Sequence, residues 1–131
     1  FDMHVKQINE ALNLCKGCVK LNVICWHQGE SDCDLFGGNS AYYNTSLRRV
    51  INQYRSLKWC DKNTPFIVGE TITEEINAQL REIAATDENI QCVKTNDLPR
   101  QKEDPIHFNA KAQRIIGTRY FEALRSVYND L

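Results

Sequence analysis

The sequence predicts an α/β fold, a three-layer α/β/α sandwich built on a parallel sheet. Three apolar, strand-like runs alternate with segments whose apolar residues recur at helical spacing. Strands separated by helices of this length imply right-handed parallel crossovers, with helices on both faces of the sheet. The 131 residues are 42% hydrophobic and 25% charged, which is typical of one globular core. We therefore expect a single α/β domain over residues 1–131.

The first half of the chain is expected to form a helix, a strand and a second helix. Apolar residues near helical spacing predict a helix over residues 4–14, which Gly17 is placed to end. Residues 19–26 are typical of a buried strand. A helix over residues 41–57 follows, with Ser40 as its expected N-cap. This helix should cover one face of the sheet.

The second half repeats the alternation. Pro65 precedes the apolar strand 66–69, and apolar residues at helical spacing predict a helix that starts near Thr73. Residues 90–94 form the third expected strand. A polar, proline-containing loop then leads to an amphipathic helix over residues 109–128. With only three strands in view, we expect the sheet to expose an edge that another segment covers.

The first candidate site follows the apolar run of residues 23–25. Gln28, Gly29, Glu30 and Ser31 come directly after this run. In parallel α/β folds, ligands bind at the carboxyl ends of the strands. A glycine there lets backbone approach a substrate, and a side-chain amide can donate to a developing oxyanion. The block indicates an active site, although an ordinary polar turn has similar composition.

The second candidate site is the segment from Asp104 to His107, just before the last helix. A carboxylate three residues before an imidazole can accept a hydrogen bond from one ring nitrogen on a tight loop. The other ring nitrogen is then left to take a proton from a nucleophile. The alternative is an Asp-Pro turn that opens a helix, with the histidine only near the helix N-terminus.

Ser31 is the one candidate nucleophile that the sequence pattern suggests within the chain. Gly29-Glu30-Ser31-Asp32-Cys33 imitates the Gly-x-Ser-x-Gly elbow of α/β-hydrolases, but Cys33 stands where the second glycine belongs. No helix pattern follows at once, as an elbow requires. We therefore expect Ser31 to hydrogen-bond the loop that presents Gln28 and Glu30.

Together the two blocks resemble the SGNH-type carbohydrate esterases, which include sialate O-acetylesterases and acetylxylan esterases. The resemblance covers about residues 21–124 and is carried by Trp26-His27-Gln28-Gly29-Glu30-Ser31, Asp104-Pro105-Ile106-His107 and Gly117-Thr118-Arg119. It implies that His107 acts as general base and that Asp104 orients it. It also implies that Gln28 and the Gly29 backbone bind the oxyanion. Glu30 could share or replace the role of Asp104, and otherwise it braces the loop.

One departure from the family is the lack of its Gly-Gln-Ser-Asn block, which carries the nucleophilic serine on the first strand. We expect the chain to be the C-terminal portion of such an esterase. The serine would then come from an N-terminal segment or from a second chain. The resemblance implies hydrolysis of acetyl esters on a carbohydrate of the sialate or xylan type. The alternative is a non-catalytic carbohydrate-binding or assembly module that retains the esterase fold.

Composition argues against several other classes of function. A net charge of −1 and a pI of about 6.3 give no electrostatic footprint for nucleic acid or an anionic membrane. No Gly-rich phosphate loop supports a flavodoxin-like nucleotide or flavin site. Cys15 and Cys18 have Cys-x-x-Cys spacing without a matching second pair, so no metal and no cofactor is expected. The six cysteines permit an oxidised or a reduced compartment.

Overall fold

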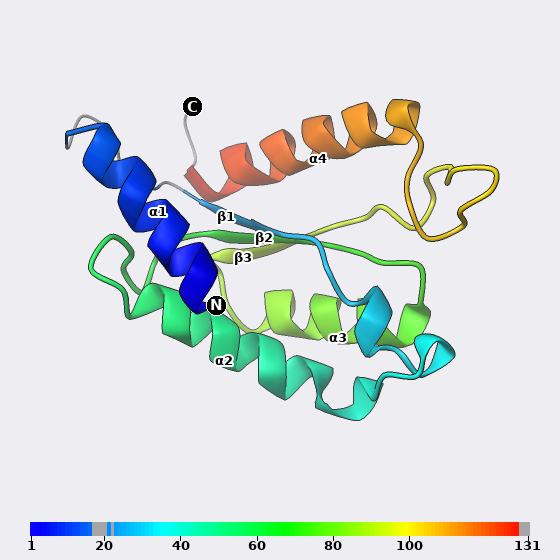
Figure 1. Cartoon of the computed structure of the whole chain (residues 1–131). Helices are drawn as coiled ribbons and strands as arrows, with labels where there is room; N and C mark the ends of the chain where they lie inside the picture. The colour runs from blue at the N-terminus through cyan, green and yellow to red at the C-terminus, as the bar shows by residue number, and fades with distance from the viewer. Residues whose placement is uncertain (17–20, 22, 129–131) are drawn as a thin grey trace.

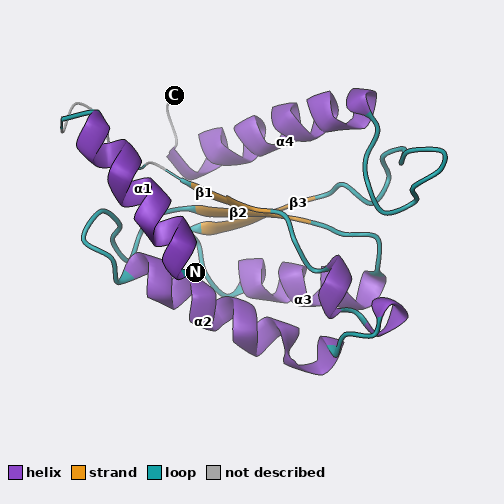
Figure 2. Cartoon of the chain, viewed as in Figure 1, coloured by secondary structure: helices purple, strands orange, loops and turns teal. Residues whose placement is uncertain are grey.

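The expected alternation of helices and strands is confirmed. The computed structural model describes residues 1–16, 21 and 23–128. Its elements are α1 (Asp2–Leu14), β1 (Ile24–Trp26), α2 (Tyr43–Arg55), β2 (Phe66–Gly69), α3 (Glu74–Ala85), β3 (Ile90–Val93) and α4 (Ala110–Tyr128). Helices lie on both sides of a parallel sheet, so the chain has the expected α/β architecture (Figures 1 and 2).

The described strands form one sheet in the order β1-β2-β3. Ile24 of β1 pairs with Phe66 of β2, which pairs in turn with Ile90 of β3. The central strand is fully buried because helices cover both of its faces, and this explains its continuous apolar run. All strands run in one direction, so their carboxyl ends meet at the edge where the loop before α4 and the short helices after β1 gather (Figure 1).

The apolar core lies mainly between the sheet and the α2–α3 layer. Leu47 and Ile51 of α2, and Leu80 and Ile83 of α3, are at most 2% exposed. Helix α4 covers the opposite face of the sheet (Figure 2). There a smaller cluster joins α4 to the preceding loop through Leu98, Phe108 and Ala112. This second cluster anchors the segment that carries His107.

The start of the second helix differs from the sequence prediction. A 3-10 turn over Ser40–Tyr42 precedes α2, and Asn39 caps it by accepting from the Ala41 backbone N–H at 3.1 Å. The expected Ser40 cap is therefore wrong, because the Ser40 hydroxyl donates to the Asp34 carboxylate instead. The strand expected over residues 19–26 is described only from Ile24. Residues 17–20 and 22, which include the expected helix stop at Gly17, lie outside the described residues.

The cysteines also depart from expectation in part. Cys25 of β1 belongs to the run expected to be a buried strand but is exposed, because β1 is an edge strand of the described sheet. Cys33 lies in the loop region after β1 and is nevertheless fully buried. No disulfide joins the five cysteines in the described part of the chain. Within the same residues, no helix is both long and apolar enough to cross a bilayer.

Candidate active site

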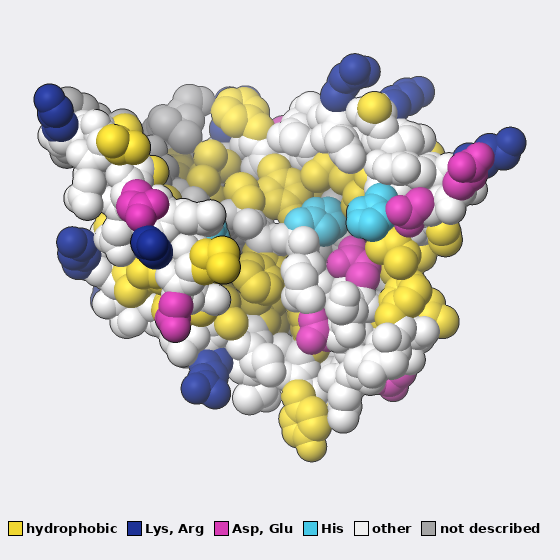
Figure 3. Space-filling view, in the orientation of Figure 1, with side chains coloured by type: hydrophobic (Ala, Val, Ile, Leu, Met, Phe, Trp, Pro, Cys, Tyr) yellow, Lys and Arg dark blue, Asp and Glu magenta, His cyan; other side chains and the backbone are white. Residues whose placement is uncertain are grey.

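The main cavity of the candidate site lies beside the carboxyl end of β1. It has a volume of about 560 Å³. Its lining residues come from the loop after β1, the loop before α4 and α4 itself: His27, Glu30, Ser31, Phe36, Ile106, His107, Phe108, Gln113 and Ile116. On this face of the molecule, histidine and acidic side chains lie together next to a hollow lined with hydrophobic side chains (Figure 3). The cavity therefore combines titratable groups with an apolar wall.

Asp104 and His107 form the expected hydrogen-bonded pair. The Nδ1 atom of His107 lies 2.5 Å from a carboxylate oxygen of Asp104, which leaves Nε2 as the second ring nitrogen. The bond to His107 is the main reason why the pKa of the Asp104 carboxyl is lowered, and two backbone N–H donors add to it. The His107 and Asp104 side chains are 69% and 39% exposed, so water reaches the pair in this chain.

The loop that presents His107 is held by its own backbone. Gln101 donates its backbone N–H to the His107 carbonyl at 2.8 Å, and Arg100 pairs with Phe108 in an antiparallel bridge. The Arg100 guanidinium also donates to the Ile106 carbonyl at 2.6 Å and lies 3.6 Å from the centre of the Phe108 ring. These contacts fix the loop at both ends, so the imidazole is presented by a preorganised segment.

Glu30 reaches the same cavity because the chain turns sharply at Gly29. Gly29 has a φ of 150°, and a Cβ there would lie 2.7 Å from Ile76 of α3, so only glycine fits. A 3-10 turn, Glu30–Asp32, follows, and the buried Cys33 thiol donates to the Glu30 carbonyl at 3.0 Å. The structure thus brings the Glu30 carboxylate and the His107 imidazole to one cavity.

Gln28 does not line the cavity that contains His107. Its side chain lines a second hollow of about 270 Å³, together with Trp26, Asp32, Tyr43, Ser46, Leu47 and Val50. There the side-chain amide nitrogen of Gln28 donates to the Asp32 carboxylate. The Tyr43 hydroxyl donates to the backbone carbonyl of Gln28 at 2.5 Å. Successive residues at the end of β1 point to opposite sides, so His27 lines the first cavity and its neighbours line the second. The amide and the His107 imidazole are therefore not brought together in the described chain.

His27 is a site residue that sequence reasoning missed. Its Nδ1 atom lies 3.2 Å from the hydroxyl of Tyr120 on α4, which donates to the Trp26 carbonyl at 3.1 Å. Desolvation by the surrounding protein is the main cause of the lowered His27 pKa. The Arg100 guanidinium lowers it further, whereas the Glu30 carboxylate and the Glu70 backbone oppose the shift. His27 and Tyr120 are separated by 93 residues, so no local pattern could have revealed the contact.

Two further residues complete the description of the cavity. Ser31 lines it together with His107 and sits in the turn after Gly29. Phe36 forms part of its apolar wall and is 43% exposed. Among the residues that the structure describes, no three His, Cys, Asp or Glu side chains are grouped to hold a metal ion.

Comparison with known proteins identifies the family. A profile described as "Carbohydrate esterase, sialic acid-specific acetylesterase" (SASA) matches residues 1–126. The chain belongs to the SASA family. This confirms the resemblance drawn from the Gln28-Gly29-Glu30-Ser31 and Asp104 to His107 blocks. The family as a whole is one of carbohydrate esterases.

A solved structure supports the fold of this SASA chain. An X-ray structure of a protein from Arabidopsis thaliana is similar with a TM-score of 0.75 and 24% sequence identity. The match covers 95% of this chain and 51% of that protein, so the SASA chain spans about half the length of this structural relative. No curated protein matches the chain at a significant level.

Proposed function

We propose that this chain supplies the general base and its carboxylate partner of a carbohydrate O-acetylesterase acting on sugars of the sialate or xylan type. The observation that carries the proposal is the 2.5 Å contact between His107 Nδ1 and Asp104, on a cavity shared with Glu30. In the proposed reaction, His107 Nε2 takes the proton of a serine hydroxyl as the oxygen attacks the acetyl carbonyl. The same nitrogen later protonates the leaving sugar oxygen. Asp104 holds the ring tautomer and stabilises the imidazolium.

The nucleophilic serine would come from an N-terminal segment or from a second chain. Ile24 of β1 donates its N–H to the Pro65 carbonyl beside β2, so the alternating backbone directs the N–H and C=O of Cys25 to the opposite edge. No described strand pairs with that edge. A strand added there would end beside the cavity, because parallel strands finish at a common edge. It would also shield the exposed His107–Asp104 pair from water, which strengthens its electrostatics.

Gln28 and the Gly29 backbone N–H would donate to the oxyanion. The Gln28 amide nitrogen carries two N–H groups, and the contact with Asp32 uses one of them. The second N–H is then available, and Asp32 sets its direction. Binding the oxyanion requires that the reacting carbonyl sit between the two hollows, beyond the end of β1. Loss of such a donor typically lowers kcat by about 10²–10³-fold, which is the effect expected for Gln28→Ala.

The principal test replaces the proposed general base in the full-length protein. His107→Ala should lower the rate of acetate release from an O-acetylated sugar and from p-nitrophenyl acetate by about 10²–10⁴-fold. The matched control is His4→Ala, because His4 lies on α1 and contacts Tyr54 rather than the cavity. Full activity of His107→Ala would exclude the proposed base. A wild-type protein that binds the sugar but releases no acetate would favour the non-catalytic carbohydrate-binding module.

A second test compares the two carboxylates. Asp104→Asn should lower kcat more than Glu30→Gln, because only Asp104 contacts the His107 ring nitrogen. The reverse order would assign the orienting role to Glu30. Ser31→Ala belongs in the same series because Ser31 lines the cavity. It should leave kcat within a few-fold of wild type, whereas complete loss of activity would make Ser31 the nucleophile and remove the need for an external serine.

A further inference from the structure

The second histidine of the cavity, His27, contacts the hydroxyl of Tyr120 through its Nδ1 atom. The Tyr120 hydroxyl donates its single proton to the Trp26 carbonyl at 3.1 Å. Its oxygen also lies 3.2 Å from His27 Nδ1, and it accepts from that atom when its own proton points to the Trp26 carbonyl. Burial raises the pKa of Tyr120, so the phenol keeps this proton at any physiological pH. In this arrangement Nδ1 of His27 carries the hydrogen.

A neutral imidazole with hydrogen on Nδ1 has an unprotonated Nε2. The Nδ1–Cε1 edge of His27 is packed against β2, since a Cβ at Gly69 would lie 2.7 Å from Nδ1 and 2.9 Å from Cε1. A ligand in the cavity that His27 lines would therefore meet Nε2 rather than the packed edge of the ring. The ring also packs edge-to-face on Phe108, with ring centroids 5.5 Å apart, which fixes its orientation.

We propose that His27 Nε2 accepts a hydrogen bond from a free hydroxyl of the sugar substrate, with Tyr120 as the positioning residue that fixes the tautomer. This inference rests on the proposed esterase function. The lowered pKa of His27 keeps its ring neutral near pH 7, so the lone pair stays available. Because His107 and His27 line one cavity, a sugar whose ester lies at His107 can bring a neighbouring hydroxyl to His27. The site would then select esters of polyols over simple esters.

The test combines a spectroscopic and a kinetic measurement on the full-length protein. Long-range ¹H–¹⁵N spectra should show His27 protonated at Nδ1 and not at Nε2. Adding methyl β-xylopyranoside or N-acetylneuraminic acid, which carry no acetyl ester, should shift the Nε2 signal. Tyr120→Phe should let the proton move to Nε2 and raise KM for the O-acetylated sugar by about 3- to 10-fold, the cost of one hydrogen bond. KM for p-nitrophenyl acetate, which has no hydroxyl, should stay unchanged.

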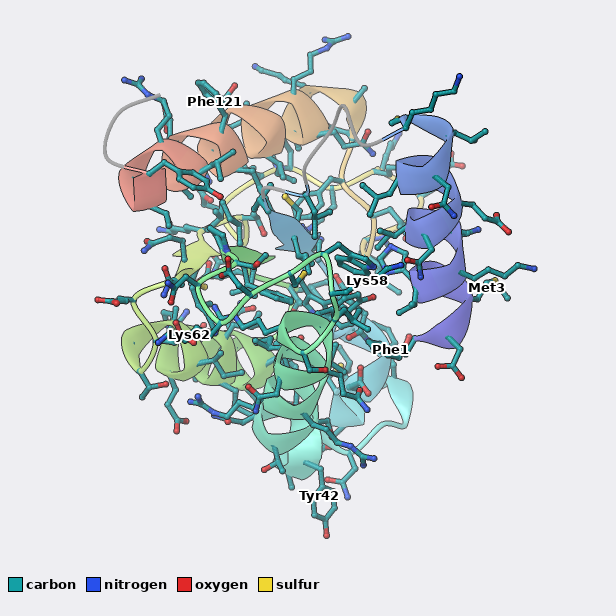
Figure 4. All side chains as sticks on the ribbon, turned by 90° about the vertical axis from the view of Figure 1, so that its left-hand side faces the viewer. Phe1, Met3, Tyr42, Lys58, Lys62 and Phe121 are labelled. Carbon is teal, nitrogen blue, oxygen red and sulfur yellow. The ribbon has the colours of Figure 1, made fainter. Side chains whose placement is uncertain are left out.

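Tyr42→Phe is the matched control. Tyr42 is 67% exposed and points away from the rest of the chain (Figure 4), so its hydroxyl should affect neither measurement. A proton on Nε2 of His27 in the wild type would overturn the inference, and so would an unchanged sugar KM in Tyr120→Phe. A protein with no esterase activity whose Nε2 signal still shifts with the sugar would refute the esterase proposal and leave the hydroxyl acceptor standing.

Discussion

The contact between His27 and Tyr120 depends on the absence of a side chain at Gly69, which makes Gly69→Ala a sharp perturbation. A Cβ at this last residue of β2 would lie 2.7 Å from His27 Nδ1 and closer still to the Tyr120 hydroxyl oxygen. Ordinary van der Waals contacts begin near 3.4 Å, so both side chains must withdraw. The two hydrogen bonds of the Tyr120 hydroxyl, at 3.1 and 3.2 Å, would then be stretched or broken.

The magnitude of the effect follows from these two bonds. Each contributes about 0.5–1.5 kcal/mol, so their loss costs about 1–3 kcal/mol of unfolding free energy. Alanine restricts the unfolded chain more than glycine does, which offsets about 0.4–1 kcal/mol. We therefore expect Gly69→Ala to lower the unfolding free energy by about 1.3 kcal/mol, within a range of about 0–2.6 kcal/mol. Urea unfolding of the full-length protein, with an unchanged m-value, would measure it.

Gly117→Ala provides the matched control for this substitution. Gly117 lies within α4, and a Cβ there meets nothing within 4 Å. Alanine is the better helix former by about 0.8–1 kcal/mol, so Gly117→Ala should stabilise the protein. A Gly69→Ala protein more stable than wild type would refute the packing argument. It would also be refuted if His27 kept its tautomer in Gly69→Ala, because the Tyr120 contact would then have survived the added methyl group.

The remaining predictions concern the cavity wall and an ion pair at α4. Phe36→Ala should raise KM for an O-acetylated sugar by about 2- to 10-fold through loss of an aromatic contact, whereas Leu35→Ala, on the same turn but outside the cavity, should not. Equal effects of the two variants would count against an aromatic subsite. Arg119 lowers the pKa of Asp97 to about 2, below its unfolded value, so this pair stabilises the fold above about pH 4 and stops doing so as the pH falls toward 2. Asp97→Asn should therefore be less stable than wild type in urea at pH 7, with the gap closing on acidification; a gap independent of pH would contradict the assignment.

Most of the fold could be predicted because its signals are local. The central strand is continuously apolar over Phe66–Gly69, and α3 presents buried residues at helical spacing, so pattern and structure agree. The cap of the 3-10 turn that precedes α2 was missed because Asn39 and Ser40 are both good caps. What decided between them was Asp34, six residues earlier, which takes the Ser40 hydroxyl. The choice between Asn39 and Ser40 depends on how the loop after β1 folds back. The capping preferences of single residue types do not encode that fold.

The exposure of Cys25 had a different cause. The apolar run that ends in Cys25 has the composition of a buried strand, and sequence alone cannot tell which strand stands at the edge of a sheet.

In the candidate site, the Asp104–His107 bond was predictable because the partners are three residues apart on one tight loop. The separation of Gln28 from His107 was not predictable in this way, because it depends on which side of β1 each loop approaches.

The two imidazoles of the cavity differ in the partner of their Nδ1 atoms, and this difference supports separate roles. His107 faces a carboxylate, which favours a positive charge on the ring during proton transfer. His27 faces a phenol that keeps its proton, in surroundings that disfavour the charged ring. A base must gain and lose a proton in each turnover, whereas a hydroxyl acceptor must stay neutral throughout. Exchanging the partners would therefore damage both roles, and for this reason we propose proton transfer for His107 and sugar recognition for His27.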